Sequence, residues 1–271
     1  MQIKLNQLEI PKPTVYASQA LQLIAEQDTD FNALGKVIMQ DPLLASALLR
    51  YANSPINRRF SEISNVPTAL NLLGLKSVRS AIVSSTLHSL CSDSTSVDNE
   101  ILQHMHNIST ICRLIARIVC QDREYDLEFL GLIHDVGMLV LATNFEEQYQ
   151  AFFIKSRQDN VALDKLEEAE FGMSHDAVSA HLAHDYRLPK SQIDLLRKYH
   201  ADAAAPTVDN NENNDEWILS MAHLLLLEIT PEGSVIYETL NSDLPSLQKL
   251  LNISDNQIDQ LRKDIKNIVQ V

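Results

Sequence analysis

The chain has 271 residues, of which 45% are hydrophobic, and its 22 Lys and Arg against 36 Asp and Glu give a formal net charge of −14. The apolar fraction excludes a mostly disordered chain, and six glycines are too few for a Rossmann sheet or a many-stranded sandwich. The negative charge argues against a nucleic-acid partner, since binding a phosphate backbone takes clustered Lys and Arg.

The start of the chain and its cysteines indicate a cytoplasmic protein. Met1–Gln7 lacks the basic and apolar regions of a signal peptide, and apolar runs such as Leu224–Leu227 are far shorter than the ~20 residues of a membrane span. Cys91, Cys112 and Cys120 are odd in number and lack C-x-x-C spacing. We therefore expect reduced thiols and no membrane partner.

The hydrophobic pattern is helical from the first clear element onward. Asp41, followed by a proline and by apolar residues at i, i+3 and i+4 spacing, predicts a capped helix. Val66 opens another helix, which Gly74 ends, and 75–90 continues as an amphipathic helix. The polar stretch 92–99 has no apolar period, so it is the predicted boundary between two helical subdomains.

The remainder of the chain repeats this pattern. The predicted helices are Asn99–Cys120, Leu127–Ala142, Phe145–Arg157, Leu163–Glu170, His175–Tyr186, Lys190–Tyr199, Glu216–Ile229 and Asp255–Val269. The gap 203–215, rich in Asn, Asp and Ala, is expected to be an exposed loop. The predicted fold is an all-α helical bundle with an N-terminal part (1–95), a second part (96–230) and a C-terminal helical extension (231–271).

Among nine histidines, the His134-Asp135 pair is the most informative. It is embedded in a nearly continuous apolar helix, where a buried carboxylate is costly unless it is paired or bound to a cation. Consecutive helix residues point about 100° apart, yet both can reach one ion above the helix if other helices complete the shell. Imidazole and carboxylate ligands suit Mn, Fe, Ni or Zn. The alternative is a metal-free aspartate, hydrogen-bonded to a backbone group or a histidine.

A second pair, His184-Asp185, serves as an internal comparison. Its flanks are polar and Pro189 follows, which is typical of a solvated helix end. His88 and His181 have no assignable role and are likewise expected to be satisfied or solvated. Two short cationic clusters, Arg50 with Arg58-Arg59 and Lys76 with Arg79, are expected to be solvated faces rather than a nucleotide site.

Several stretches, in the same order, resemble the HDOD domain, a relative of the HD-domain metal-dependent phosphohydrolases. They are DPLLASALLRYANS (41–54), ALNLLGLKSVR (69–79), LIHDVG (132–137), FGMSH (171–175) and YRLP (186–189), the last leading to Tyr199-His200. The resemblance covers roughly Leu8 to Ile229 and makes 96–230 the HD-like part. It implies a regulatory domain of bacterial signal transduction.

The resemblance also implies a divalent-metal site. The predicted ligands are His106, His134, Asp135 and His223 for one metal, with His175 and His200 for a second. His104 lies two residues from His106, on a different helix face, and is expected on the surface. If the protein is an enzyme, Asp135 is the predicted catalytic residue, since it can bind metal and orient the attacking water.

Two departures from the family pattern bear on catalysis. Ala222-His223 stands where the family has an Ala-Asp pair, which removes one negative charge from the site. Met138 stands where active cyclic-dinucleotide phosphodiesterases of the HD type carry a lysine, and after His200 there is no Gly-Tyr-Pro sequence. That lysine and loop would help to position a phosphate.

These observations lead to two functional hypotheses. The first is an HDOD-type regulatory protein with a degenerate metal site, which acts in trans on a signalling protein partner and holds a divalent transition metal or no cofactor. The second is a metal-dependent phosphohydrolase acting on a nucleotide or a phosphodiester, in which a metal-bound water attacks phosphorus.

Overall fold

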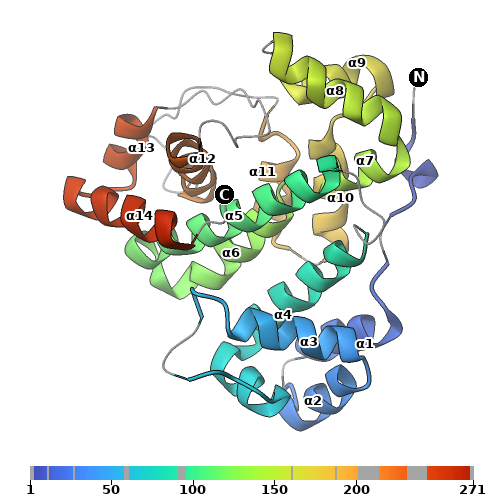
Figure 1. The fold of residues 1–271 in the computed structure, drawn as a ribbon, viewed down its shortest axis with the longest axis vertical. Helices are drawn as coiled ribbons and strands as arrows, with labels where there is room; N and C mark the ends of the chain where they lie inside the picture. Colours follow the sequence, from blue (N-terminus) through green and yellow to red (C-terminus); the bar gives the residue numbers. More distant parts are fainter. Residues whose placement is uncertain are drawn as a thin grey trace. The chain divides into compact units, whose positions relative to one another are not determined.

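The computed structural model describes residues 3–10, 12–26, 28–57, 61–90, 96–159, 161–186, 188–200, 214–230 and 243–268. These residues form helices and short connections and include no strand (Figure 1), which confirms the all-α prediction. The chain divides into two compact units, Ile10–Asp93 and Met1–Glu9 together with Ser94–Val271. Cys91, the Arg58-Arg59 pair and most of the predicted loop 203–215 lie outside the described residues.

The unit Ile10–Asp93 is a small helical bundle. Its helices are α1 (Val15–Ile24), α2 (Phe31–Met39), α3 (Pro42–Ala52) and α4 (Val66–Leu90). The Asp41 side chain caps α3, and Gly74 breaks α4 with φ 70° and ψ 168°, as the sequence predicts. Helices α1 and α2, capped by Thr14 and Asp30, are additional to the predicted set. A core of buried aliphatic side chains holds the bundle together.

The second unit holds the remaining helices. They are α5 (Ser96–Val119), α6 (Glu124–Ile133), α7 (Val136–Asn144), α8 (Glu146–Asp159), α9 (Leu163–Phe171), α10 (His175–Asp185), α11 (Lys190–Leu196), α12 (Asn214–Ile229), α13 (Leu244–Leu250) and α14 (Asp255–Ile268), with short 3-10 turns at Leu5–Gln7 and Gln121–Arg123. Helix α5 packs against both α6 and α12 (Figure 1). A buried ion pair between Arg113 and Glu128, 3.1 Å apart, links α5 to α6.

The predicted helix over 127–142 is wrong, because the structure breaks it at the His-Asp pair. His134 follows the end of α6, and Asp135, with φ −108° and ψ 19°, precedes α7. Helix α10 approaches the start of α7 so closely that a Cβ on Gly137 would lie 2.1 Å from the His175 carbonyl oxygen. The Gly137 N–H donates to Ser179 Oγ at 2.9 Å. The two site residues therefore lie on a turn between helices.

We expect Gly137→Ala to lower the free energy of unfolding by about 3 kcal/mol, because the added methyl group meets backbone rather than a flexible side chain. The matched control is Gly35→Ala in α2, where a Cβ would lie 3.4 Å from Leu70 Cδ1 and the helix propensity of alanine favours the change. Urea denaturation of both variants checks this. Equal stability of the two would show that α7 and α10 are not held this close.

Candidate metal centre

The turn between α6 and α7 aims His134 and Asp135 at each other. His134 Nδ1 donates to the Gly131 carbonyl at 2.7 Å, so in the neutral ring Nε2 keeps its lone pair. That Nε2 lies 2.9 Å from Asp135 Oδ2. Asp135 is 0% exposed, and neither of its oxygens accepts a well-formed hydrogen bond. The pair thus presents a buried carboxylate that lacks a conventional donor.

Histidines from two other helices complete a first cluster of His104, His134, Asp135 and His223, whose ligand atoms all lie within 4.8 Å of one another. His223, on α12, places Nε2 3.1 Å from His134 Nε2, while its Nδ1 lies 2.9 Å from the Leu219 carbonyl. His104, on α5, places Nε2 3.3 Å from Asp135 Oδ2. Two helices and one turn therefore supply the four side chains.

The donor atoms of this cluster fit a divalent transition metal. His134 and His223 each place Nδ1 against a backbone carbonyl, which leaves a lone pair on the Nε2 of each ring. These two Nε2 atoms face each other, and that of His134 also faces Asp135 Oδ2. Acceptors that face each other at about 3 Å repel unless a proton or a cation lies between them. Neighbouring ligands of one ion, each ~2.0–2.2 Å from it, have a similar separation.

Asp135 also belongs to a second cluster with His175 and His200. His175 Nε2 lies 3.8 Å from Asp135 Oδ1 and 3.2 Å from His200 Nδ1. The two oxygens of Asp135 therefore face different groups of histidines. All six histidine and aspartate side chains of the two clusters are at most 9% exposed.

Two buried carboxylates support the second cluster. Glu167, at 0% exposure, accepts from His175 Nδ1 at 2.7 Å, from the His175 backbone N–H at 2.6 Å and from the Tyr149 hydroxyl at 2.5 Å. Asp176 Oδ1 lies 2.7 Å from His200 Nδ1. A carboxylate that fixes the second nitrogen of a histidine is the usual outer support of a metal-binding imidazole.

The charges of the site shift two pKa values in opposite directions. Burial by itself raises the pKa of Asp135, but the electrostatic interaction with the neighbouring His134 and the contact with His104 outweigh it and hold that pKa well below its usual range. Burial lowers the pKa of His175, yet the charge and hydrogen bond of Glu167 outweigh it and raise that pKa to about 9. Asp135 is therefore ionised at neutral pH and ready to bind a cation.

The structure brings together five of the six predicted ligands: His134, Asp135, His175, His200 and His223. It places His106 outside both clusters, half-buried, with Nδ1 2.7 Å from the Leu102 carbonyl of its own helix. The prediction that His104 lies on the surface is wrong, because this side chain is buried and occupies the first position of the cluster. Residues two apart face opposite sides of a helix, so only one of the two can point inward.

Glu167 and Asp176 were not predicted. A signal existed for Asp176, which forms a third His-Asp dipeptide with His175, but none for Glu167, which reaches the site across the turn between α9 and α10. The solvated end predicted for His184-Asp185 is confirmed, with both side chains exposed. Cys112 and Cys120 are free thiols.

The fold and the site together define a helical protein with a buried cluster of histidine and carboxylate ligands. The HDOD domain family matches residues 10–202, and the chain belongs to this family. No match was found among curated protein sequences. No helix within the described ranges has both the length and the apolar character needed to cross a bilayer.

Solved structures show the same fold. An HDOD domain protein of unknown function from Geobacter sulfurreducens is 20% identical, with a TM-score of 0.67 over 98% of this chain and 96% of that one. A protein from Shewanella amazonensis, provisionally described as a metal-dependent phosphohydrolase, is 15% identical, with a TM-score of 0.68 over 98% and 95%. A provisionally described signal transduction protein from Marinobacter aquaeolei is 16% identical, with a TM-score of 0.68. The match covers 99% of this chain and 59% of that one.

Proposed function

We propose that this protein is a regulatory module of bacterial signal transduction that holds a divalent transition metal and acts through a protein partner in the cytoplasm. Residues 1–95 and 96–230 would form its two HDOD parts, with 231–271 as an extension. The main support for a metal is the environment of Asp135, a fully buried carboxylate that lies among imidazole lone pairs. His104, His134, Asp135 and His223 would hold one ion, and His175 and His200, with Asp135, a second.

Hydrolysis of a nucleotide or phosphodiester is the weaker alternative. A substrate phosphate must reach the ion, yet the cluster side chains are at most 9% exposed. Two cavities of the described part of the chain, one between α12, α13 and α14 and one beside Thr14 and His88, are not lined by any cluster residue. Met138, where a phosphate-positioning lysine would stand in an active relative, is itself buried. A metal held in this environment suits a structural or sensing role. When bound, the ion supplies positive charge that neutralises Asp135 and ties α5, the α6–α7 turn and α12 together.

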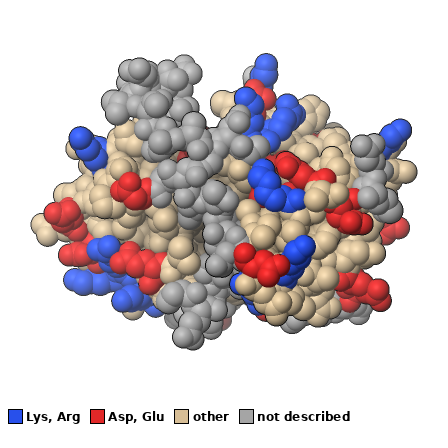
Figure 2. All heavy atoms as spheres, turned by 90° about the horizontal axis from the view of Figure 1, so that it is seen from above, with Lys and Arg blue, Asp and Glu red and all other residues tan. Residues whose placement is uncertain are grey.

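A protein partner fits the surface better than a nucleic acid. On the face shown in Figure 2, Lys and Arg atoms alternate with Asp and Glu atoms and form no continuous basic area among the described residues. With a net charge of −14, the chain lacks the excess of cations that phosphate-backbone binding requires. The surface therefore suits a protein, which presents side chains of mixed character, better than a polyanion such as a nucleic acid.

Elemental analysis of the purified chain, combined with a hydrolysis screen, tests the proposal. We expect about one or two ions of Fe, Mn, Ni or Zn per chain, and no turnover of nucleoside phosphates or cyclic dinucleotides beyond that of an Asp135→Ala variant. Turnover that is lost in Asp135→Ala would establish the hydrolase instead. Absence of any stoichiometric metal after loading with each of the four ions would contradict the metal centre.

A further inference from the structure

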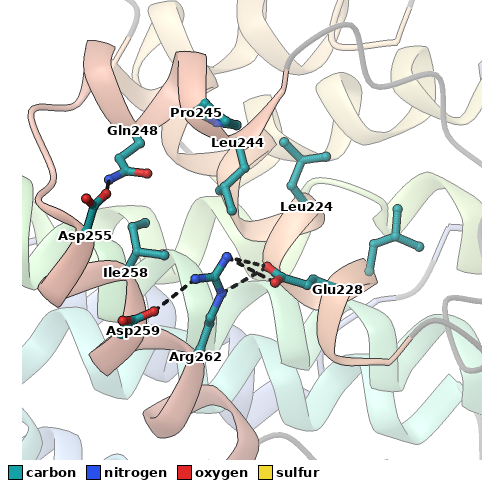
Figure 3. Close-up of a pocket in the computed structure, with 10 residues that line it drawn as sticks. Leu224, Glu228, Leu244, Pro245, Gln248, Asp255, Ile258, Asp259 and Arg262 are labelled. Atoms are coloured by element: carbon teal, nitrogen blue, oxygen red, sulfur yellow. Dashed lines mark hydrogen bonds and ion pairs between the residues drawn. The ribbon is translucent and has the colours of Figure 1, made fainter.

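The C-terminal helices form a groove that belongs to neither metal cluster. It has a volume of about 630 Å³ and lies between α12, α13 and α14 (Figure 3). All of its lining residues fall between 224 and 262, outside the span of 10–202 that matches the HDOD family. We call it the C-terminal groove.

The floor of the C-terminal groove is apolar. Leu224 and Leu227 come from α12, Leu244 and Pro245 from the start of α13, and Ile258 from α14. Ile258 is buried and forms the base, whereas Leu227 is 43% exposed and Pro245 is exposed. Large apolar side chains left in water at the edge of a concave surface are typical of a protein-binding site.

The rim of the C-terminal groove is acidic. Its lining includes three carboxylates and one guanidinium: Glu228 and Asp259 flank Arg262, and Asp255 lies farther along the rim beside Gln248 (Figure 3). Arg262 donates to Glu228 at 3.1 and 3.2 Å and to Asp259 at 3.1 Å. Its positive charge is therefore paired with carboxylates of the rim itself. The rim therefore presents a net negative charge beside an apolar floor.

We propose that the C-terminal groove binds a basic amphipathic segment of a partner protein, one that presents leucine-like side chains to the floor and Lys or Arg to the rim. This inference rests on the proposed partner-mediated function and names the surface to which the partner would bind. Charge complementarity selects the occupant. A second copy of this chain is disfavoured because each copy carries a net charge of −14, and a nucleic acid is disfavoured because its phosphates would face the rim carboxylates.

Fluorescence anisotropy with designed peptides tests the groove on the full chain. The probe is a labelled 14-residue peptide of Leu and Lys, with leucines at helical i, i+3, i+4 spacing. Two control peptides keep the length, with Glu in place of Lys or Ser in place of Leu. We expect saturable binding of the Leu/Lys peptide only, weakened by salt because the rim contributes attraction.

Substitutions then locate the binding site. We expect Leu227→Gln to weaken the Leu/Lys peptide about tenfold, since it removes a large part of the exposed apolar floor. Asp259→Lys, at a side chain 65% exposed, should weaken it about fivefold at low salt. The matched controls are Leu43→Gln, an exposed leucine of the other unit, and Asp194→Lys on α11, which makes the same charge change outside the groove. Both controls should bind within twofold of the parent.

Each outcome has a defined meaning. No binding of the Leu/Lys peptide, equal binding of the Leu/Glu peptide, or equal losses in Asp194→Lys and Asp259→Lys would overturn the groove as the docking surface. All four variants change exposed side chains, and matching thermal melts establish that the folds are intact. The assay does not depend on metal, so a failure here leaves the metal content and hydrolysis results, and thus the proposed function, standing separately.

Discussion

Replacement of Asp135 by asparagine is expected to lower the metal affinity of the protein by more than about 100-fold. Asp135 is the one residue shared by the two clusters, and it supplies the only negative charge among their ligand atoms. Asparagine keeps the shape of the side chain but removes that charge. Both sites should therefore weaken together. Titration with a chelating metal indicator, followed by elemental analysis, measures the change.

The second His-Asp pair provides the matched control for this prediction. Asp185→Asn makes the same chemical change beside His184, at an exposed helix end, and should leave the metal content unchanged. A similar loss in both variants would mean that the effect is not specific to the buried site. Retention of metal in Asp135→Asn would show that the ion is held elsewhere.

The metal-free protein is expected to become less stable between pH 6.5 and pH 9. His175 has its folded pKa raised to about 9 from the ordinary value of 6.5, chiefly because Glu167 outweighs the effect of burial. A raised pKa contributes stability that is fully present below 6.5 and is lost as the pH rises through 9. At 1.36 kcal/mol per pKa unit, the loss in the free energy of unfolding is up to ~3 kcal/mol. Urea denaturation at a series of pH values in the presence of a chelator measures it.

Glu167→Gln should flatten this pH dependence, because the neutral amide no longer favours a protonated His175. The variant should also be about 2 kcal/mol less stable at pH 6.5, since three hydrogen bonds lose their charged acceptor. Glu147→Gln, an exposed residue on α8, is the control and should retain the parental curve. An unchanged slope in Glu167→Gln would assign the pH dependence to another group.

Local signals in the sequence were strong enough to predict several elements. Asp41 followed by proline predicts the start of α3, and Gly74 predicts the break in α4, because capping and positive φ depend on the residue itself and its nearest neighbours. Helices α1 and α2 were not predicted, although Thr14 and Asp30 carry the same kind of cap. A cap without a long apolar stripe is a weaker signal.

The helical period of α5 distinguishes His104 from His106. Buried residues of α5 recur at 101, 105, 108, 111 and 115, and His104 falls on this stripe, three residues after Ile101 and four before Ile108. His106 lies off the stripe. The helical period of α5 is therefore a better guide than the family pattern to which of the two side chains points inward.

The sequence by itself determined the helical class, the HDOD family and five of the six histidines and aspartates that come together in the two clusters. These depend on local periodicity and on motifs that are contiguous in the chain. Only the tertiary structure decided the break between α6 and α7, the role of Glu167 and the presence of the C-terminal groove. The break goes with the close approach of α10 to Gly137, and the other two depend on how successive helices pack and orient their side chains, which no local pattern encodes.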